Sequence, residues 1–159
     1  MASRRRGRIL AFQALYSWEA SHNPAGASPA PAVPETVFDF SWLENEKQDA
    51  LDDGTRDFSR LLIAGTIENI KAVDEMIKRH LKNWDFSRLN RVDLALLRLS
   101  AYTLLFQADI PPSIVIDEAI GISKEFGTDD SFRFINGVLD GIRKTIQGTQ
   151  SPESKELSP

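Results

Sequence analysis

The segment from residue 88 to residue 108 is the most apolar part of the chain, and it constrains the fold more than any other feature. Drawn as a helix, it carries large apolar side chains around its whole circumference: Leu94, Leu96, Leu97, Leu99, Leu104, Leu105 and Phe106. Such a helix needs neighbours on several sides, because apolar surface left in water costs free energy. The sequence therefore predicts a central helix surrounded by others.

Further segments supply these neighbours. Apolar residues recur at spacings of three and four, the pattern of amphipathic helices, and the expected helices cover residues 9–20, 55–83, 114–126 and 128–146. The second of these is long for one globular helix, so we expect two helices with a bend at residues 68–73.

Turn residues mark the ends of these helices. Asp85 or Ser87 can cap the start of the central helix, and Pro111 with its neighbouring proline ends it, because proline cannot donate to the helical ladder. Ser113 can cap the next helix. Gly127 can end that helix in the left-handed conformation that glycine adopts easily.

The length and composition indicate one soluble domain without a catalytic centre. The chain has 159 residues, of which 42% are hydrophobic and 26% charged, and it lacks cysteine. It contains no phosphate-binding loop, zinc-protease motif or nucleophile beside a histidine base. Asp129 and Asp130 are adjacent and would point about 100° apart on a helix, which favours capping over metal binding. We expect no enzyme, no metal and no cofactor.

The N-terminus superficially resembles a signal peptide, because a basic stretch precedes apolar residues 9–12. Gln13 and Glu19 interrupt that apolar run, and no stretch approaches the ~20 apolar residues that cross a bilayer. We therefore expect a cytoplasmic protein that does not bind membranes.

Four arginines precede the expected start of the first helix at Ile9, and we call them the arginine arm: Arg4, Arg5, Arg6 and Arg8. They lie at the positive end of the helix dipole, where cations do not stabilise a helix. A solvated tail is one interpretation. Nucleic-acid contact is favoured, because guanidinium groups pair with phosphates and stack on bases, and Gln13 and Tyr16 lie on or beside the same polar strip.

The rest of the chain is acidic. The arm holds four of the 19 basic residues, which leaves 15 basic against 23 acidic side chains, a net charge of −8 outside the arm. This charge would repel RNA elsewhere on the surface and could attract a basic protein.

Two segments outside the helices differ in composition. Residues 22–41 are rich in proline and indicate an exposed loop, which apolar residues at 37–43 could anchor. Residues 147–159 are polar and indicate a disordered tail. The expected organisation is an arm at 1–8, a helical domain at 9–146 and this tail.

The last helix has an unusual outward face. One side of residues 126–146 is apolar, whereas the opposite side carries Asp130, Arg133, Phe134, Gly137 and Gly141. Glycine costs a helix about 1 kcal/mol relative to alanine, and an exposed phenylalanine gains nothing from water, so this face suggests a surface that another molecule approaches closely. A slight rotation of the helix that buries Phe134 is the alternative.

Asp93 and Arg98 are the notable polar groups of the apolar central helix. Buried charges need partners, either within the chain or on another chain, and internal pairing is favoured. The basic residues at 78–82 complement a helix C-terminus, which is favoured over a second RNA-binding patch.

Two parts of the sequence resemble the NusB family of bacterial transcription antitermination factors. The matching residues are Arg4-Arg5-Arg6, Gln13-Ala14-Leu15-Tyr16-Ser17-Trp18, Val92-Asp93, Leu97-Arg98, Ile110-Pro111, Asp117-Glu118-Ala119 and the whole of FGTDDSFRFINGVLD at 126–140. They occur in order and cover about half of the chain. Residues 22–53 depart from the family pattern in length and proline content.

This resemblance implies an all-α single domain of two packed three-helix bundles. It also implies binding of boxA-type single-stranded RNA together with ribosomal protein NusE, in a complex with NusA, NusG and RNA polymerase. It assigns RNA contact to the arm, Gln13, Tyr16, Arg133 and Phe134, and partner contact to Asp93 and Asp130. It favours a stand-alone factor over the similar module of certain ribosomal RNA methyltransferases, and it allows a homodimer. A helical adapter that binds only protein is the alternative.

Overall fold

The structure, a computed structural model, describes residues 4–22, 40, 51–81 and 85–150. Every regular element in these ranges is a helix, which confirms the predicted fold class. The elements are α1 (Arg4–His22), α3 (Asp53–Glu68), α4 (Ile70–Arg79), the short 3-10 helix η3 (Phe86–Arg88), α5 (Arg91–Phe106), α6 (Pro112–Phe126) and α7 (Ser131–Gln150). None of the helices described combines the length and apolar character needed to span a bilayer.

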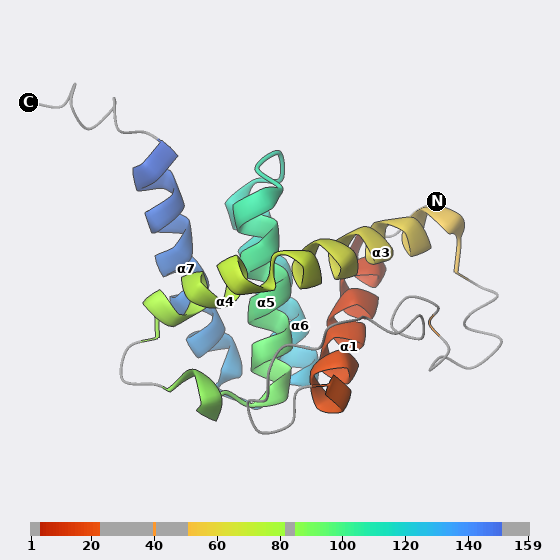
Figure 1. The fold of residues 1–159 in the computed structure, drawn as a ribbon, viewed down its shortest axis with the longest axis horizontal. Helices are drawn as coiled ribbons and strands as arrows, with labels where there is room; N and C mark the ends of the chain where they lie inside the picture. Colours follow the sequence, from red (N-terminus) through yellow and green to blue (C-terminus); the bar gives the residue numbers. More distant parts are fainter. Residues whose placement is uncertain (1–3, 23–39, 41–50, 82–84, 151–159) are drawn as a thin grey trace, which may run out of the picture.

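Helix α5 lies in the middle of the fold and packs against α1, α3, α4, α6 and α7. In Figure 1, α7 and α1 stand on opposite sides of α5, while α3 and α4 run across it. The side chains of Leu96 and Leu97 have no exposed surface. The predicted central helix is therefore confirmed, and its apolar circumference is explained by its neighbours.

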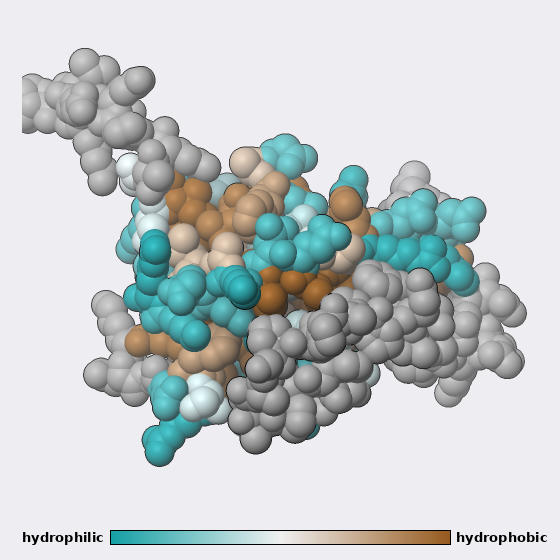
Figure 2. All heavy atoms as spheres, in the orientation of Figure 1, coloured by the Kyte–Doolittle hydropathy of each residue, from teal (hydrophilic) through white to brown (hydrophobic). Residues whose placement is uncertain are grey.

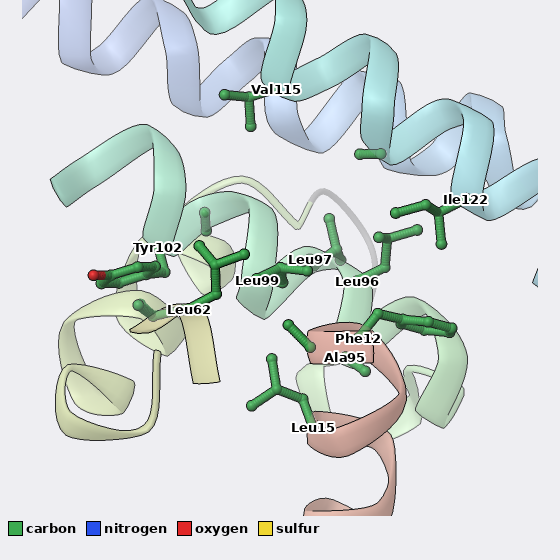
Figure 3. Close-up of a cluster of buried hydrophobic side chains, with 14 of the residues drawn as sticks. Phe12, Leu15, Leu62, Ala95, Leu96, Leu97, Leu99, Tyr102, Val115 and Ile122 are labelled. Carbon is green, nitrogen blue, oxygen red and sulfur yellow. The ribbon is translucent and has the colours of Figure 1, made fainter. Parts of the chain in front are cut away.

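The core is built where α1, α3 and α6 meet α5. Figure 3 shows Phe12 and Leu15 of α1, Leu62 of α3 and Ile122 of α6 turned toward the leucines of α5. Full burial of one such side chain stabilises the fold by about 1.5–3 kcal/mol. The apolar face that α1 contributes therefore fixes the position of the arginines carried by the same helix.

Helices α3 and α5 approach each other closely at Gly65. A Cβ atom at this position would collide with the hydroxyl of Tyr102, so only glycine fits beneath that ring. Asn69 then separates α3 from α4, and its side-chain Nδ2 donates to the Gly65 carbonyl at 2.8 Å. The predicted bend within residues 68–73 is confirmed.

The first caps differ from those expected. Helix α5 begins after Asn90, whose Oδ1 accepts a 2.8 Å hydrogen bond from the Asp93 amide. Asp85 caps η3 instead, through a 3.2 Å bond from the Ser87 amide. The sequence offers several residues that can cap, and the extra 3-10 turn decides which of them faces the start of α5.

The predictions for Ser113 and Gly127 were wrong. Helix α6 begins at Pro112 with Pro111 at its N-cap, so Ser113 lies inside the first turn. Gly127 has an extended backbone with φ of −93°. Glycine is needed there for space, because a Cβ atom would lie 2.8 Å from the Ser123 carbonyl oxygen.

The boundaries of the terminal helices also differ. Helix α1 begins at Arg4, so the residues at 4–8 are helical, and α7 continues to Gln150 past the expected end at Ile146. Phe40 is fully buried and supports the predicted anchor. The remainder of the proline-rich segment, including 23–39, lies outside the described residues, as do residues 151–159.

Figure 2 shows the face crossed by α3 and α4. Polar side chains cover these two helices, and apolar side chains gather between α7 and α5. A hollow at that place is lined by Leu104, Ala108, Ile110 and Ile146, together with polar residues of α7. This apolar end of the molecule is separate from the polar surface described next.

Candidate functional site

The arginine arm forms the first two turns of α1. Arg4, Arg5 and Arg6 are exposed, whereas the side chain of Arg8 is only 12% exposed. Because these residues are helical, the arm is held by the same helix that packs against α3 and α5. The expectation that the arginines precede the helix was wrong.

Two arginines of the arm pair with α6. Arg5 donates from Nη1 to Oε2 of Glu118 at 3.2 Å, and its Nη2 lies 3.7 Å from Oε2 of Glu125. Arg8 Nη1 lies 3.6 Å from the other oxygen of Glu118. Burial lowers the pKa of Arg8, and the nearby Glu118 carboxylate acts in the opposite direction. These contacts give Arg5 and Arg8 a role in packing that the sequence did not indicate.

Phe58 on α3 supports the arm from the other side. The guanidinium carbons of Arg4 and Arg8 lie 4.5 Å and 5.6 Å from the centre of its ring, within the range of cation–π contacts. The ring also covers Gly7, where a Cβ atom would lie 2.6 Å from the ring carbon Cδ2. Glu118 and Phe58 are thus positioning residues for the arm that sequence reasoning missed, since no local pattern links them to α1.

Gln13 and Tyr16 continue along α1 from the arm. Gln13 is half-buried, and Tyr16 is 39% exposed beside a shallow hollow. The other residues that line this first hollow come from the start of α5 and from the α6–α7 turn: Asn90, Arg91, Val92, Phe126, Gly127 and Thr128. The hollow therefore presents an aromatic ring, an exposed cation and polar backbone within one depression.

A second hollow adjoins the first and shares Asn90 and Thr128 with it. It contains both predicted partner-binding residues, Asp93 and Asp130, together with Phe134 and the exposed Arg88. Asp130 is exposed at the start of α7, whereas Asp93 is 7% exposed. The structure therefore brings together residues that lie far apart in the sequence.

Asp93 has incomplete internal pairing. Its Oδ2 accepts a 3.1 Å hydrogen bond from Asn90, but its buried Oδ1 has no hydrogen-bond partner within the described part of the chain. Burial raises the pKa of Asp93, and the neighbouring side chains of Ser131 and Asn90 act in the opposite direction. No cation pairs with Asp93 among the described residues, unlike Arg98, which pairs internally as expected.

A third hollow follows on the other side of Phe134, which lines both. Its lining includes Arg133, Gly137, Gly141 and His80. Phe134 is half-buried and packs partly against the core, so it is neither fully outward nor fully rotated inward. The three hollows together form one surface from Tyr16 to Arg133, which we call the α1–α7 surface.

Gly137 and Gly141, the two glycines expected on the outward face of α7, lie in different surroundings. A Cβ atom at Gly137 would meet nothing within 4 Å, so this position is open, as expected. At Gly141 a Cβ atom would lie 2.8 Å from Nδ1 of His80, whose Nε2 lies 3.0 Å from the hydroxyl of Thr145. Gly141 therefore accommodates the side chain of His80, the C-cap residue of α4, so the close approach expected at this glycine is made within the chain.

Metal binding finds no support in the described ranges, where no three His, Asp or Glu residues are grouped so as to hold an ion. Asp129 and Asp130 are both exposed next to α7. The α1–α7 surface offers hydrogen-bonding groups, arginines and aromatic rings.

Comparisons with known proteins show the family to which the chain belongs. A model of the NusB family matches residues 5–144. The transcription antitermination protein NusB of Treponema pallidum (strain Nichols) is 53% identical over 142 residues, which cover 89% of this chain and 93% of that protein.

Solved structures share the fold. The structure of T. maritima NusB superposes with a TM-score of 0.74 at 36% identity, covering 91% of this chain and 93% of that chain. A complex of the antitermination factors NusB and NusE with double-stranded RNA contains a chain with a TM-score of 0.73 at 24% identity, covering 89% of this chain and 96% of that one, which shows the common fold. The chain described here therefore belongs to the NusB family.

Proposed function

We propose that this protein is a transcription antitermination factor that binds boxA-type single-stranded RNA together with ribosomal protein NusE. The observation that carries the proposal is the continuity of the α1–α7 surface with the arginine arm along α1. In this proposal NusA, NusG and RNA polymerase complete the assembly, as the family resemblance implies. The protein acts by bringing RNA and proteins together.

The chemistry of the arm suits the RNA backbone. Arg4, Arg5 and Arg6 are exposed at one end of α1, where guanidinium groups can pair with phosphates. Arg8 is largely enclosed by Phe58 and Glu118, so we assign it mainly to holding the arm in place. The acidic remainder of the chain disfavours RNA elsewhere.

Bases would be bound along the α1–α7 surface. Tyr16 offers an aromatic ring in the first hollow and Phe134 offers one between the second and third, and a stacked base contributes about 1–3 kcal/mol in single-strand complexes. Gln13 and Arg133 can add hydrogen bonds from α1 and α7. The single strand leaves its base edges free for such contacts.

NusE would bind at the second hollow, where Asp93 and Asp130 lie. The exposed carboxylate of Asp130 is an acceptor for donors of a basic protein, and the carboxylate of Asp93 adds negative charge beneath the same hollow. Because this hollow adjoins both others, a protein bound there would lie beside the RNA. That arrangement explains why NusE should increase RNA affinity.

A titration with a short boxA-like RNA, with and without NusE, tests the proposal. The double variant R5Q/R6Q should weaken RNA binding, and the salt dependence should fall by about 0.7 for each phosphate that the variant no longer neutralises. The control K71Q/R79Q removes two exposed cations of α4 that line none of the three hollows, and it should leave the binding nearly unchanged.

A protein-only adapter is the competing function. It predicts that NusE binds while RNA affinity stays weak, does not rise on adding NusE, and responds equally to R5Q/R6Q and K71Q/R79Q. That combination of results would overturn the RNA-binding function and retain the partner-binding one.

A further inference from the structure

Arg5 occupies a defined position on α6 that we call the Arg5 seat, formed by Glu118, Gly121 and Glu125. The two carboxylates lie on either side of its guanidinium, at 3.2 Å from Nη1 and 3.7 Å from Nη2. Residues 118, 121 and 125 are spaced by three and four, so they share one face of the helix. An exposed arginine that would meet RNA is thus held by two acids of the same chain.

Gly121 shapes this seat. A Cβ atom there would lie 3.0 Å from Nη1 and 3.5 Å from Nη2 of Arg5, a tighter approach than most side-chain contacts allow. Glycine lowers helix stability by about 1 kcal/mol relative to alanine. In this helix it lets a guanidinium lie directly against the backbone between the two carboxylates.

The same contacts leave Arg8 in place when Arg5 moves. Arg8 pairs with the second oxygen of Glu118 and packs against Phe58, and it is far less exposed than Arg5, whose side chain is 49% exposed. A movement of the Arg5 side chain away from α6 therefore leaves the arm itself attached. Only the guanidinium of Arg5 can leave its carboxylates for another anion without detaching the arm.

We propose that the Arg5 seat is an autoinhibitory contact, in which Glu118 and Glu125 compete with RNA phosphates for Arg5. This inference rests on the proposed RNA-binding function. A carboxylate and a phosphate offer a guanidinium the same kind of charge-assisted hydrogen bond, so Arg5 can satisfy only one of them fully. The two acids also repel the phosphate backbone at the place where the arm is exposed.

This contact would limit the RNA affinity that the arm can supply through phosphate contacts alone. Every RNA has phosphates, so an unopposed arm would bind RNA regardless of sequence. With Arg5 engaged by α6, the arm contributes less to that binding. Contacts along the α1–α7 surface, at Tyr16 and Phe134, must supply a larger share of the affinity.

The test compares E118Q with D117N in the full-length protein. Both remove one negative charge from α6, but Asp117 is exposed and forms no ion pair among the described residues. Affinity for a boxA-like RNA and for a scrambled RNA of equal length is measured at several salt concentrations. E118Q should bind both RNAs about two- to fivefold more tightly than D117N, the range given by an exposed ion pair.

The salt dependence gives an independent measure. E118Q should steepen the dependence of log affinity on log salt by about 0.7, the value for one additional phosphate neutralised on a single strand. In an R5Q background, E118Q should show no gain beyond that of D117N. Equal affinities and equal slopes for E118Q and D117N would overturn the proposal.

E118Q also removes a partner of Arg8 and could disturb the fold, so a second variant is needed to separate a folding defect from the proposed effect. G121A displaces the Arg5 guanidinium without changing any charge, and it should raise RNA affinity in the same direction as E118Q. No gain with G121A, in a protein whose unfolding shows that it is folded, would also contradict the proposal. Absence of RNA binding by the wild type, with and without NusE, would instead overturn the proposed function on which this inference rests.

Discussion

Arg98 on α5 binds Asp74 on α4 through two parallel hydrogen bonds, from Nε to Oδ1 at 2.9 Å and from Nη2 to Oδ2 at 3.0 Å. Its remaining Nη1 donates to Glu19 of α1 at 3.1 Å. One buried guanidinium therefore connects three helices. The aromatic rings of Trp18 and Phe86 lie 5.8 Å from its central carbon and shield these bonds from water.

Substitution R98M should lower the free energy of unfolding by about 3–5 kcal/mol, because it removes the guanidinium that pairs with two largely buried carboxylates. Methionine keeps most of the apolar volume between the two rings. Urea unfolding measures the loss, and R91M on the same helix serves as an exposed control. A loss below about 1 kcal/mol would show that the carboxylates find other partners.

Substitution D93N should stabilise the protein at neutral pH. Burial raises the pKa of Asp93 above its unfolded value, so its favourable contribution is present below the unfolded pKa of about 3.9 and is lost as the pH rises through the folded pKa. The ionised carboxylate therefore lowers the free energy of unfolding at pH 7, and asparagine removes this buried charge. The gain should shrink when urea unfolding is repeated near pH 3.5.

The same substitution should weaken NusE binding, because it removes the negative charge of Asp93 from the hollow proposed for that partner. D129N, at an exposed acid next to α7, should change neither stability nor NusE affinity by much. If D93N left NusE affinity unchanged, the proposed partner role of Asp93 would lose its basis.

Substitution F134A should reduce RNA affinity by about 1–3 kcal/mol, the contribution of one stacked base. Phe134 is half-buried, so the loss of unfolding free energy should remain below the 3–5 kcal/mol typical of a fully buried phenylalanine. F106A is the control, since Phe106 is an exposed phenylalanine of α5 that lines none of the three hollows. A stability loss in the full core range without weaker RNA binding would make Phe134 a core residue.

Alanine should affect stability differently at Gly137 and at Gly141 of α7. G137A should raise the free energy of unfolding by up to about 1 kcal/mol, because the site is open and alanine favours helix. G141A should gain less or lose stability, because it displaces His80 from Thr145. Thermal unfolding of both variants measures the difference, and equal gains would show that His80 moves away freely.

Much of the fold follows from sequence periodicity. The apolar circumference of 88–108 predicts a central helix, and the length of 55–83 predicts a break, which Asn69 provides. The N-caps at Asn90 and Pro111 are harder to predict, because several residues in each turn could occupy the N-cap position. Only the neighbouring helices decide among them.

The sequence predicts the residues of the candidate site better than it predicts the contacts that hold them. The arm, Tyr16 and Phe134 are recognisable from charge, exposed aromatics and the family resemblance. Their partners Glu118 and Phe58 are not, because each belongs to a regular amphipathic helix with nothing unusual in its own spacing. The contact between Gly141 and His80 is not predictable either, since it depends on how the end of α4 packs against α7.

Helix α5 packs against α1, α3, α4, α6 and α7, and the buried apolar residues of the described ranges form one cluster. The domain should therefore unfold in one cooperative transition. Any ligand that binds only the folded state then raises the free energy of this global unfolding, wherever it is bound. A shift in melting temperature can thus report RNA or NusE binding without a label near the α1–α7 surface.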